Sequence, residues 1–249
     1  FMNEAQTACS PFNEDHQSFR QTCRRFVSEK ITPRIDEWEA NKGYDRSIFP
    51  EMGAMGLLGI PYPEEYGGSE LDFWYSVVWM EELARCGAAG FPMSTMVHSY
   101  MASPPIERFG TKELKDRFMP QIVSGEKITA LAISEPGAGS DVAGIRTTAV
   151  RDGDHYIVNG SKTFITNGTE ADLLTLAVKT DPTQTHSGVS ALVFETDTPG
   201  FSIGRKLEKL GCHSSDTAEL AFDNCRVPVN NLLGKEGEGF YIIMDNFQQ

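Results

Sequence analysis

Two neighbouring segments decide how this sequence is interpreted: Leu131-Ala-Ile-Ser-Glu-Pro-Gly-Ala-Gly-Ser-Asp-Val-Ala-Gly-Ile-Arg-Thr147 and Asn159-Gly-Ser-Lys-Thr-Phe-Ile-Thr-Asn-Gly168. Each brings small hydroxyl side chains and backbone amides to the end of a predicted strand. Gly137 and Gly139 let the backbone approach a ligand closely. Such groups suit the planar, polar-edged ring of a flavin, for which Thr166 would supply a donor and Phe164 an apolar face.

Simpler explanations exist for each segment taken alone. An ordinary β-turn accounts equally well for Ser134 to Asp141, because the loop is rich in turn-forming residues. Phe164 alone is typical of a core aromatic residue, and Thr166 of a strand residue. The first loop is not a dinucleotide-binding fingerprint, because Val142 stands where the third glycine should be. The flavin hypothesis therefore depends on the pairing of the two segments.

The first half of the chain has helical periodicity. Ser10-Pro11 is a good helix start, and apolar residues from Phe12 to Val27 follow at helical spacing. Leu71 to Arg85 and the segment after Thr111 predict further helices. The period changes to strand-like alternation near residue 127, so we place a domain boundary at residues 125–127.

The second half predicts short strands and tight turns. Asp152-Gly153 indicates a hairpin, and Asn159-Gly160 indicates a second tight turn. The fold class is therefore α+β, with an all-helical domain at residues 1–126 and an antiparallel β domain at 127–238. Residues 239–249 begin a helix. The predicted strands cover residues 128–134, 147–151, 155–158, 162–166, 173–179, 189–195, 201–205 and 220–222.

Composition excludes several classes of protein. A hydrophobic content of 40% and a charged content of 23% are typical of a globular protein. The net charge of -13 argues against a nucleic-acid-binding or anionic-membrane surface. No apolar run approaches the roughly 18 residues of a membrane span. Five cysteines without CxxC spacing indicate reduced thiols in a cytosol-like compartment.

Other kinds of site have little support in the sequence. No two histidines have metal-ligand spacing, so we expect no metal site. A Gly-x-Ser-x-Gly elbow is absent, which argues against a hydrolase triad. None of the carboxylates in the chain stands out as a catalytic base.

Motifs along nearly the whole chain, from about Glu14 to Gln249, resemble those of the acyl-CoA dehydrogenases. Each motif is weak alone, but together and in order they are specific. The sequence from Gly204 to Leu220 is most similar to that of long-chain and related bacterial members. The motifs are Gly56-Leu-Leu-Gly-Ile60, Glu65-Tyr-Gly-Gly68, Ser134-Glu-Pro-Gly-Ala-Gly-Ser-Asp141, Asn159-Gly-Ser-Lys-Thr-Phe-Ile-Thr-Asn-Gly168, Lys209-Leu-Gly with Ser215-Asp-Thr217, and Leu233-Gly-Lys-Glu-Gly-Glu-Gly-Phe240.

The resemblance implies a fold, a cofactor and partners. It implies a helical N-terminal domain, a β-barrel-like middle domain, and a C-terminal four-helix domain that this chain does not include. It further implies FAD, a homotetramer or homodimer, and an electron-transfer flavoprotein as oxidant in fatty-acid β-oxidation. The compartment would be the bacterial cytoplasm or the mitochondrial matrix.

The same resemblance implies site residues. Flavin contacts would come from Leu131, Ile133, Ser134, Gly139, Ser140, Phe164, Ile165 and Thr166, with Thr166 near the flavin N5. Phe164 stands where many members carry tryptophan, and this departure keeps a flat aromatic ring. Ser140 would also face the acyl-CoA. We expect the wall of the acyl-chain site to contain Met96, Val97 and Tyr100.

The implied reaction converts an acyl-CoA to its trans-2-enoyl-CoA. A carboxylate would remove the α-proton while the β-hydrogen leaves as hydride to the flavin. No such base is assigned in this chain, and we expect the glutamate after Gln249 or later in a C-terminal domain. An acyl-CoA oxidase, a flavin monooxygenase of the same fold, and a non-catalytic binding module stay open as alternatives. The length and branching of the acyl chain also stay open.

Overall fold

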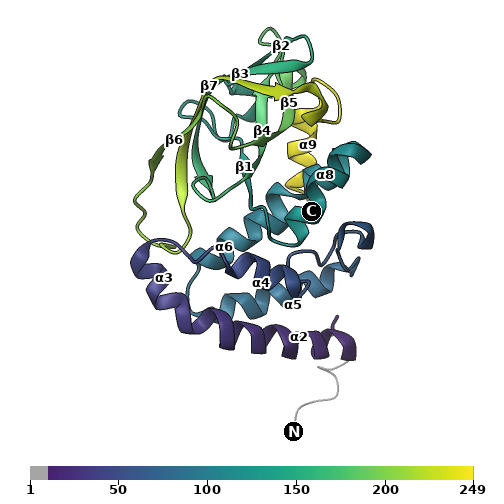
Figure 1. Ribbon diagram of the computed structural model, residues 1–249, viewed down its shortest axis with the longest axis vertical. Helices are drawn as coiled ribbons and strands as arrows, with labels where there is room; N and C mark the ends of the chain where they lie inside the picture. Colours follow the sequence, from purple (N-terminus) through teal and green to yellow (C-terminus); the bar gives the residue numbers. More distant parts are fainter. Residues whose placement is uncertain (1–10, 249) are drawn as a thin grey trace.

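The computed structural model describes residues 11–248, which divide into a helical part and a sheet (Figure 1). Helices α2 to α6 fill the lower part of the view, and the strands and α9 lie above them. Two π-helical segments, η1 and η5, continue α2 and α6. The bounds are α2 (Glu14–Phe26), η1 (Val27–Ile31), α3 (Ile35–Asn41), α4 (Ile48–Ala54), α5 (Phe73–Leu83), α6 (Gly90–Met96), η5 (Val97–Ala102), α7 (Pro104–Phe109), α8 (Lys112–Val123) and α9 (Gly239–Asn246).

The first described helix begins later than the sequence predicts. Its N-cap is Asn13, whose side chain accepts a hydrogen bond from His16 N at 2.9 Å. In return, Asn13 N donates to His16 Nδ1 at 3.1 Å, which completes a capping box. The predicted start at Ser10-Pro11 is therefore wrong, because this reciprocal pair satisfies the helix end three residues further on. Ser10 itself lies outside the described residues.

One sheet contains the strands of the described chain, and its order is β6-β7-β3-β2-β4-β5-β8, with β1 paired to β4. Most pairs are antiparallel, as the sequence predicts, but β4 pairs in parallel with β1, with Thr129 opposite Leu173, and with β2. Within residues 11–248, no pairing joins β6 to β8, so the sheet stays open. The bounds are β1 (Thr129–Ala132), β2 (Thr148–Asp152), β3 (His155–Thr166), β4 (Leu173–Lys179), β5 (Val189–Glu195), β6 (Phe201–Lys206), β7 (Thr217–Pro228) and β8 (Leu232–Leu233).

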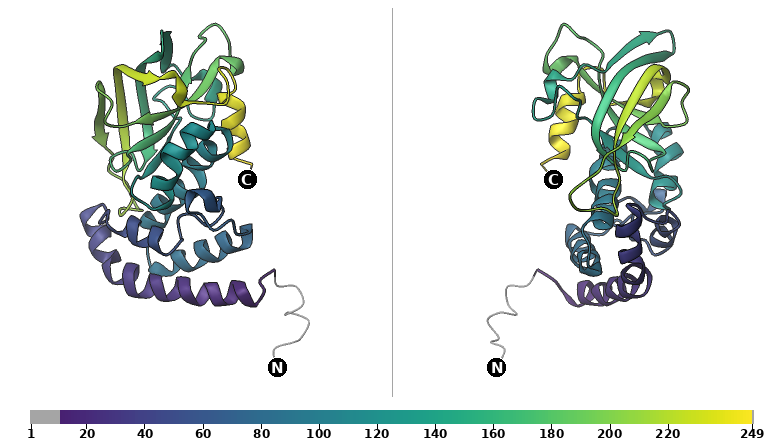
Figure 2. Two further views of the ribbon diagram at one scale, coloured as in Figure 1. Left: turned by 45° about the vertical axis from the view of Figure 1, so that its right-hand side comes forward. Right: turned by 90° about the vertical axis from the view of Figure 1, so that its left-hand side faces the viewer.

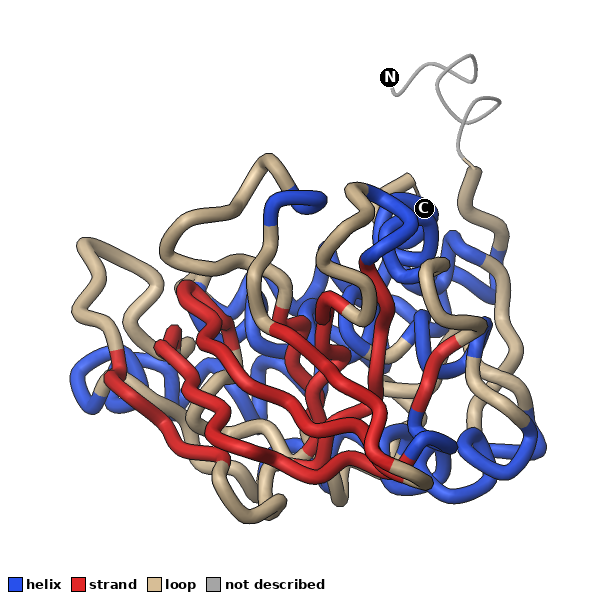
Figure 3. The backbone as a smooth tube through the Cα atoms, turned by 90° about the horizontal axis from the view of Figure 1, so that it is seen from above, coloured by secondary structure: helices blue, strands red, loops and turns tan. Residues whose placement is uncertain are grey.

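Figure 2 shows the yellow α9 beside the sheet in both views, with the purple α2 below. Seen from above, the strands gather into one twisted layer (Figure 3). Apolar side chains of β3, β4, β5 and β7 form the core of this layer. A separate core among the helices contains Trp38, Phe49, Trp79 and Phe91.

The long strand β3 corrects one prediction. Asn159-Gly160 is not a tight turn, because β3 runs through it and pairs with β7 on both sides. The register shifts between Val158 and Gly160 and again between Lys162 and Ile165, so the strand contains two bulges. The tertiary pairing of this long strand overrides a local preference for a turn. The second bulge turns the chain at Phe164.

The helical part and the sheet are joined by buried hydrogen bonds. The side-chain nitrogen of Asn167, just after β3, donates to Ser94 O at 2.9 Å and to Thr129 O at 3.1 Å. It thereby connects α6 with β1. A second bond joins two helical segments, since Asn246 of α9 donates to Met101 O of η5 at 2.8 Å. These contacts hold α6 against β1 and α9 against η5.

Candidate functional site

A cavity of about 200 Å³ lies where the end of β1, the second bulge of β3 and η5 meet. Its lining is mostly apolar, with two hydroxyl side chains. The lining residues are Val97, Met101, Leu131, Ile133, Ser134, Gly139, Val142, Phe164, Ile165, Thr166 and Phe247. Both sequence segments that predict a flavin site therefore meet at one place.

The first arm of the cavity is the loop that follows β1. Glu135 and Ala138 exchange backbone hydrogen bonds of 2.7 and 3.1 Å, which close the loop into a tight turn. A Cβ built on Gly139 would meet no atom within 4 Å, so the space beside this backbone is open to a ligand. The neighbouring Ser140 is exposed and is not one of the lining residues.

The second arm is the end of β3. Phe164 has a φ of +58°, which is uncommon for a residue with a bulky side chain. Its ring is 69% exposed, whereas Ile165 beside it is buried. Thr166 is paired with Thr217 of β7. The bulge therefore holds an aromatic ring out of the core and against the cavity, at a backbone strain of about 1–2 kcal/mol.

The third wall of the cavity is η5. Of the residues that the sequence suggested for the acyl-chain wall, only some line the cavity. Val97 and Met101 line the cavity, whereas Met96 and Tyr100 pack against the helical core. Residues four apart share one face of a helix, so the two pairs lie on two different faces. Sequence analysis missed Met101, which the same spacing from Val97 would have found.

Two further lining residues were not anticipated. Val142 follows the first arm, and Phe247 follows α9. Their contribution depends on how distant segments fold back, which no local pattern reveals. Among the described residues, the lining contains no lysine, arginine or carboxylate. The cavity therefore has no built-in charge of its own.

A buried pair of charged side chains lies beside the two arms. Lys162 of β3 is almost completely buried, and its Nζ lies 2.8 Å from Glu135 Oε1. Burial lowers the pKa of Lys162 to about 8, against the opposing effect of Glu135. Burial of Glu135 acts against its ionisation, but Lys162 and the backbone hydrogen bonds outweigh it and lower the pKa of this carboxyl. The pair is an ion pair at neutral pH.

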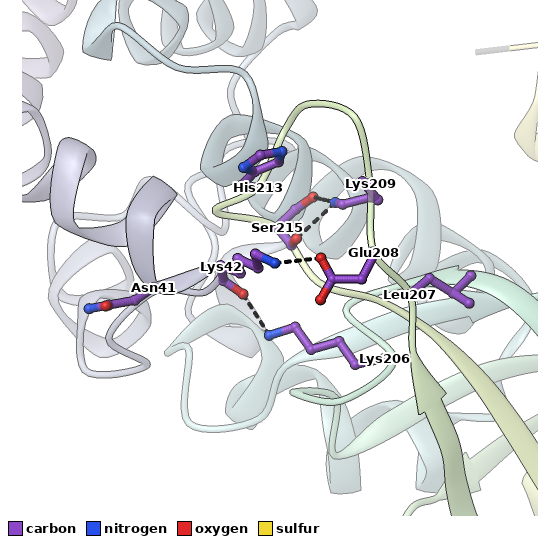
Figure 4. A pocket seen from close by; sticks show the side chains of 8 residues that line it. All are labelled: Asn41, Lys42, Lys206, Leu207, Glu208, Lys209, His213 and Ser215. Carbon is purple, nitrogen blue, oxygen red and sulfur yellow. Dashed lines mark hydrogen bonds and ion pairs between the residues drawn. The ribbon is translucent and has the colours of Figure 1, made fainter.

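A second hollow, of about 220 Å³, lies between the end of α3 and the loop that connects β6 with β7 (Figure 4). Three lysines line it, but each has a partner within the chain. Lys42 pairs with the Glu208 carboxylate, Lys206 donates to Lys42 O at 2.6 Å, and Lys209 donates to Ser215 O at 2.8 Å. These bonds satisfy the lysines, so the hollow is a weaker candidate for a ligand site.

Other kinds of site are not found within residues 11–248. No cluster of three or more His, Cys, Asp or Glu side chains there could hold a metal ion. The described cysteines Cys23, Cys86, Cys212 and Cys225 are free thiols. None of the helices in this part of the chain has the length and apolar character needed to cross a membrane.

Comparison with protein-family models adds an independent result to this geometry. Residues 13–126 match the N-terminal domain of acyl-CoA dehydrogenases, and residues 130–225 match their middle domain. The chain belongs to the acyl-CoA dehydrogenase family. All of the cavity-lining residues except Phe247 thus lie in the two matched ranges.

Individual members of the acyl-CoA dehydrogenase family resemble the chain closely. It is 41% identical over 234 residues to an acyl-CoA dehydrogenase of Bacillus subtilis (strain 168), covering 94% of the chain and 61% of that protein. The crystal structure of the Geobacillus kaustophilus acyl-CoA dehydrogenase has a TM-score of 0.93 and 49% identity, covering 96% of this chain and 63% of that one.

An acyl-CoA dehydrogenase of Bacillus anthracis, crystallised in complex with FAD, has a TM-score of 0.88 and 35% identity. This match covers 95% of the chain and 40% of that one. The chain spans about three fifths of the length of its Bacillus subtilis relative. Family membership is therefore shown for the helical and sheet-rich parts.

Proposed function

We propose that the gene product containing this chain is an FAD-dependent acyl-CoA dehydrogenase that converts a fatty acyl-CoA to the trans-2-enoyl-CoA. One observation carries the proposal: two separate segments, the loop after β1 and the end of β3, present hydroxyls, an exposed aromatic ring and open backbone to a single cavity. Such an arrangement fits the ring system of a flavin, and it occurs in a chain of this family.

The size of the cavity limits what it holds. Ligand pockets usually enclose about 300–1,000 Å³. A cavity of about 200 Å³ accommodates a ring system and not a whole dinucleotide. The proposal therefore assigns the isoalloxazine ring to this cavity and the adenosine part of FAD to other surfaces. Ser140, exposed next to Gly139, is placed on the path to the phosphates.

Each lining group has a proposed role toward the flavin. Thr166 would donate near the N5 atom, and Phe164 would cover one face of the ring. Leu131, Ile133 and Ser134 would contact the ring from β1, and Ile165 would support it from β3. The cofactor, when bound, accepts the hydride that leaves the substrate.

The substrate side of the cavity is assigned to η5. Val97 and Met101 would form the wall for the acyl chain, and Met96 and Tyr100 would support that wall from the helical core. A carboxylate base must also reach the α-proton of the thioester. Because no carboxylate among residues 11–248 lines the cavity, the proposal assigns the base to none of the described residues.

The proposal includes partners and location. Electrons would pass to an electron-transfer flavoprotein, and the enzyme would assemble as a homotetramer or homodimer. Its place would be the bacterial cytoplasm or the mitochondrial matrix. The free thiols of the four described cysteines agree with a reducing compartment.

The test is an anaerobic visible absorption spectrum of this gene product, recorded before and after addition of straight and branched acyl-CoA thioesters. A flavin band that bleaches supports the proposal and identifies the substrate. A protein without a flavin band contradicts it. A flavin band that no acyl-CoA bleaches favours the non-catalytic binding module. Rapid reoxidation of the bleached enzyme in air would instead favour an oxidase.

A further inference from the structure

The buried Glu135–Lys162 pair connects more of the chain than an ordinary ion pair does. Lys162 Nζ donates to Glu135 Oε1 at 2.8 Å and to Ile133 O at 2.9 Å. Glu135 in turn accepts from Arg146 N at 2.6 Å and from Thr147 N at 3.0 Å. The pair thus binds the end of β1, the start of β2 and the centre of β3 at one point.

These anchor points flank both arms of the cavity. Ile133 and Glu135 lie on either side of Ser134 in the first arm. Lys162 lies two residues before Phe164, at the bulge that begins the second arm. Between them, Thr163 N donates to Ser134 O at 2.9 Å. A shift of either charged side chain would therefore move one arm relative to the other.

Stability alone does not account for the pair. Removing a lysine and a carboxylate from water is unfavourable, and their attraction offsets this only when the geometry is very good. Apolar side chains of similar volume commonly stabilise a fold equally well or better. Because the pair connects both arms of the neighbouring cavity, it also has a role in the shape of that cavity.

We propose that Glu135 and Lys162 are positioning residues that hold the two arms in the register required for flavin binding. Neither residue lines the cavity itself, and they act through their lining neighbours Ile133, Ser134 and Phe164. This inference rests on the proposed flavin site. The position of one arm relative to the other, and not only the presence of both arms, determines how the flavin ring is bound.

The experiment uses the gene product containing this chain, freed of flavin and titrated with FAD. The variants are Lys162→Met, Glu135→Gln and the double substitution. Lys179→Met is the matched control, because the Lys179 side chain is also buried on the sheet but its Nζ donates to Gln184 O and Thr185 O and not to Glu135. The readouts are the FAD dissociation constant, the visible circular dichroism of bound FAD and the thermal unfolding midpoint.

Positioning and simple stabilisation predict different results. The double substitution removes both charges, so the midpoint should recover relative to Lys162→Met, which leaves a buried carboxylate unpaired. If the pair positions the arms, FAD binding stays weakened by about tenfold or more in the double variant, and the dichroism of bound FAD stays altered. Lys179→Met should lower the midpoint without either effect on FAD.

The contrary results are equally clear. FAD affinity and dichroism that return to wild-type values in the double variant would overturn the inference, as would changes that merely follow the midpoint across all variants. If Lys162→Met does not fold, Glu135→Asp replaces it, because it keeps the charge and shortens the link. A wild-type protein that binds no FAD would instead overturn the proposed function.

Discussion

The Nδ1 atom of His98 lies 3.1 Å from the backbone nitrogen of Thr129, and this contact joins η5 to β1. Because a backbone N–H can only donate, Nδ1 is the unprotonated nitrogen of the ring. Nε2 then carries the proton and donates to Ile122 O at 3.1 Å. His98 is thus a neutral, fully buried connector next to Val97, which lines the cavity.

This connector predicts a specific pH dependence of stability. Burial lowers the pKa of His98 from 6.5 to about 4. Between these values the unfolded chain takes up a proton that the folded chain excludes, so the contribution to stability is complete above pH 6.5 and is lost as the pH falls through about 4. Between about pH 7 and 4, the free energy of unfolding of wild type should fall by about 3 kcal/mol more than that of His98→Gln. Urea denaturation at several pH values measures this, and parallel curves for the two proteins would contradict it.

The bulge at Gly160 predicts a strong intolerance of side chains. Its φ is +148°, and an added Cβ would lie 2.5 Å from Thr147 Oγ1 and 2.7 Å from Thr147 Cα. We expect Gly160→Ala to lower the free energy of unfolding by about 3 kcal/mol. The control is Gly153→Ala, since Gly153 also has a positive φ but open space around it, and it should cost about 1 kcal/mol. Chemical denaturation of both variants tests the difference, and equal losses would be inconsistent with a clash at Thr147.

Substitution of Phe164, whose ring is exposed, should change FAD binding more than folding stability. Phe164→Gly relieves the strain of a positive φ but adds freedom to the unfolded chain, so stability should change by less than about 1 kcal/mol. Loss of the aromatic face should weaken FAD binding by about tenfold. Phe164→Trp keeps a flat ring and should bind FAD like wild type. Fluorescence titration with FAD measures the affinity of both variants. An unchanged affinity of the glycine variant would show that Phe164 does not contribute to the proposed site.

Met101 should limit the length of the acyl chain. Met101→Phe places a rigid ring where a flexible thioether lines the cavity, so kcat/KM for long-chain substrates should fall by about tenfold while short-chain substrates are less affected. Met55→Phe is the matched control, because Met55 is similarly exposed but lies at the end of α4 and does not line this cavity. Steady-state kinetics over a series of acyl-CoA chain lengths provides the measurement. A uniform loss for all chain lengths would argue against a wall at Met101.

Local sequence was sufficient for some parts of this structure and not for others. The change of period near residue 127 falls between α8 and β1. It is visible in the sequence because the spacing of buried apolar residues differs between a helix and a strand. The prediction of a tight turn at Asn159-Gly160 was wrong, because the turn preference is local whereas the pairing of β3 with β7 is not. Ser10-Pro11 misled for a similar reason, because Asn13 and His16 form a better cap.

The candidate site shows the same division. Seven of the eight residues predicted to contact the cofactor line one cavity, because their two segments are each locally distinctive. The helical wall was only half anticipated, since Met96 and Tyr100 turn to the core while Met101 turns to the cavity. Phe247 could not be foreseen, because nothing in its own neighbourhood indicates where α9 docks.

The π-helical geometry of η5 has a consequence for how this wall can diverge among related proteins. Each of its hydrogen-bonded turns encloses one residue more than a turn of α-helix. Loss of a single residue from Val97–Ala102 would remove this extra residue and restore an α-helix, while the segments on either side keep their faces. The side chains within the shortened turn would then change their positions along the cavity wall. A one-residue deletion would therefore alter the shape of the proposed acyl-chain wall and leave the sheet and the two arms of the cavity intact.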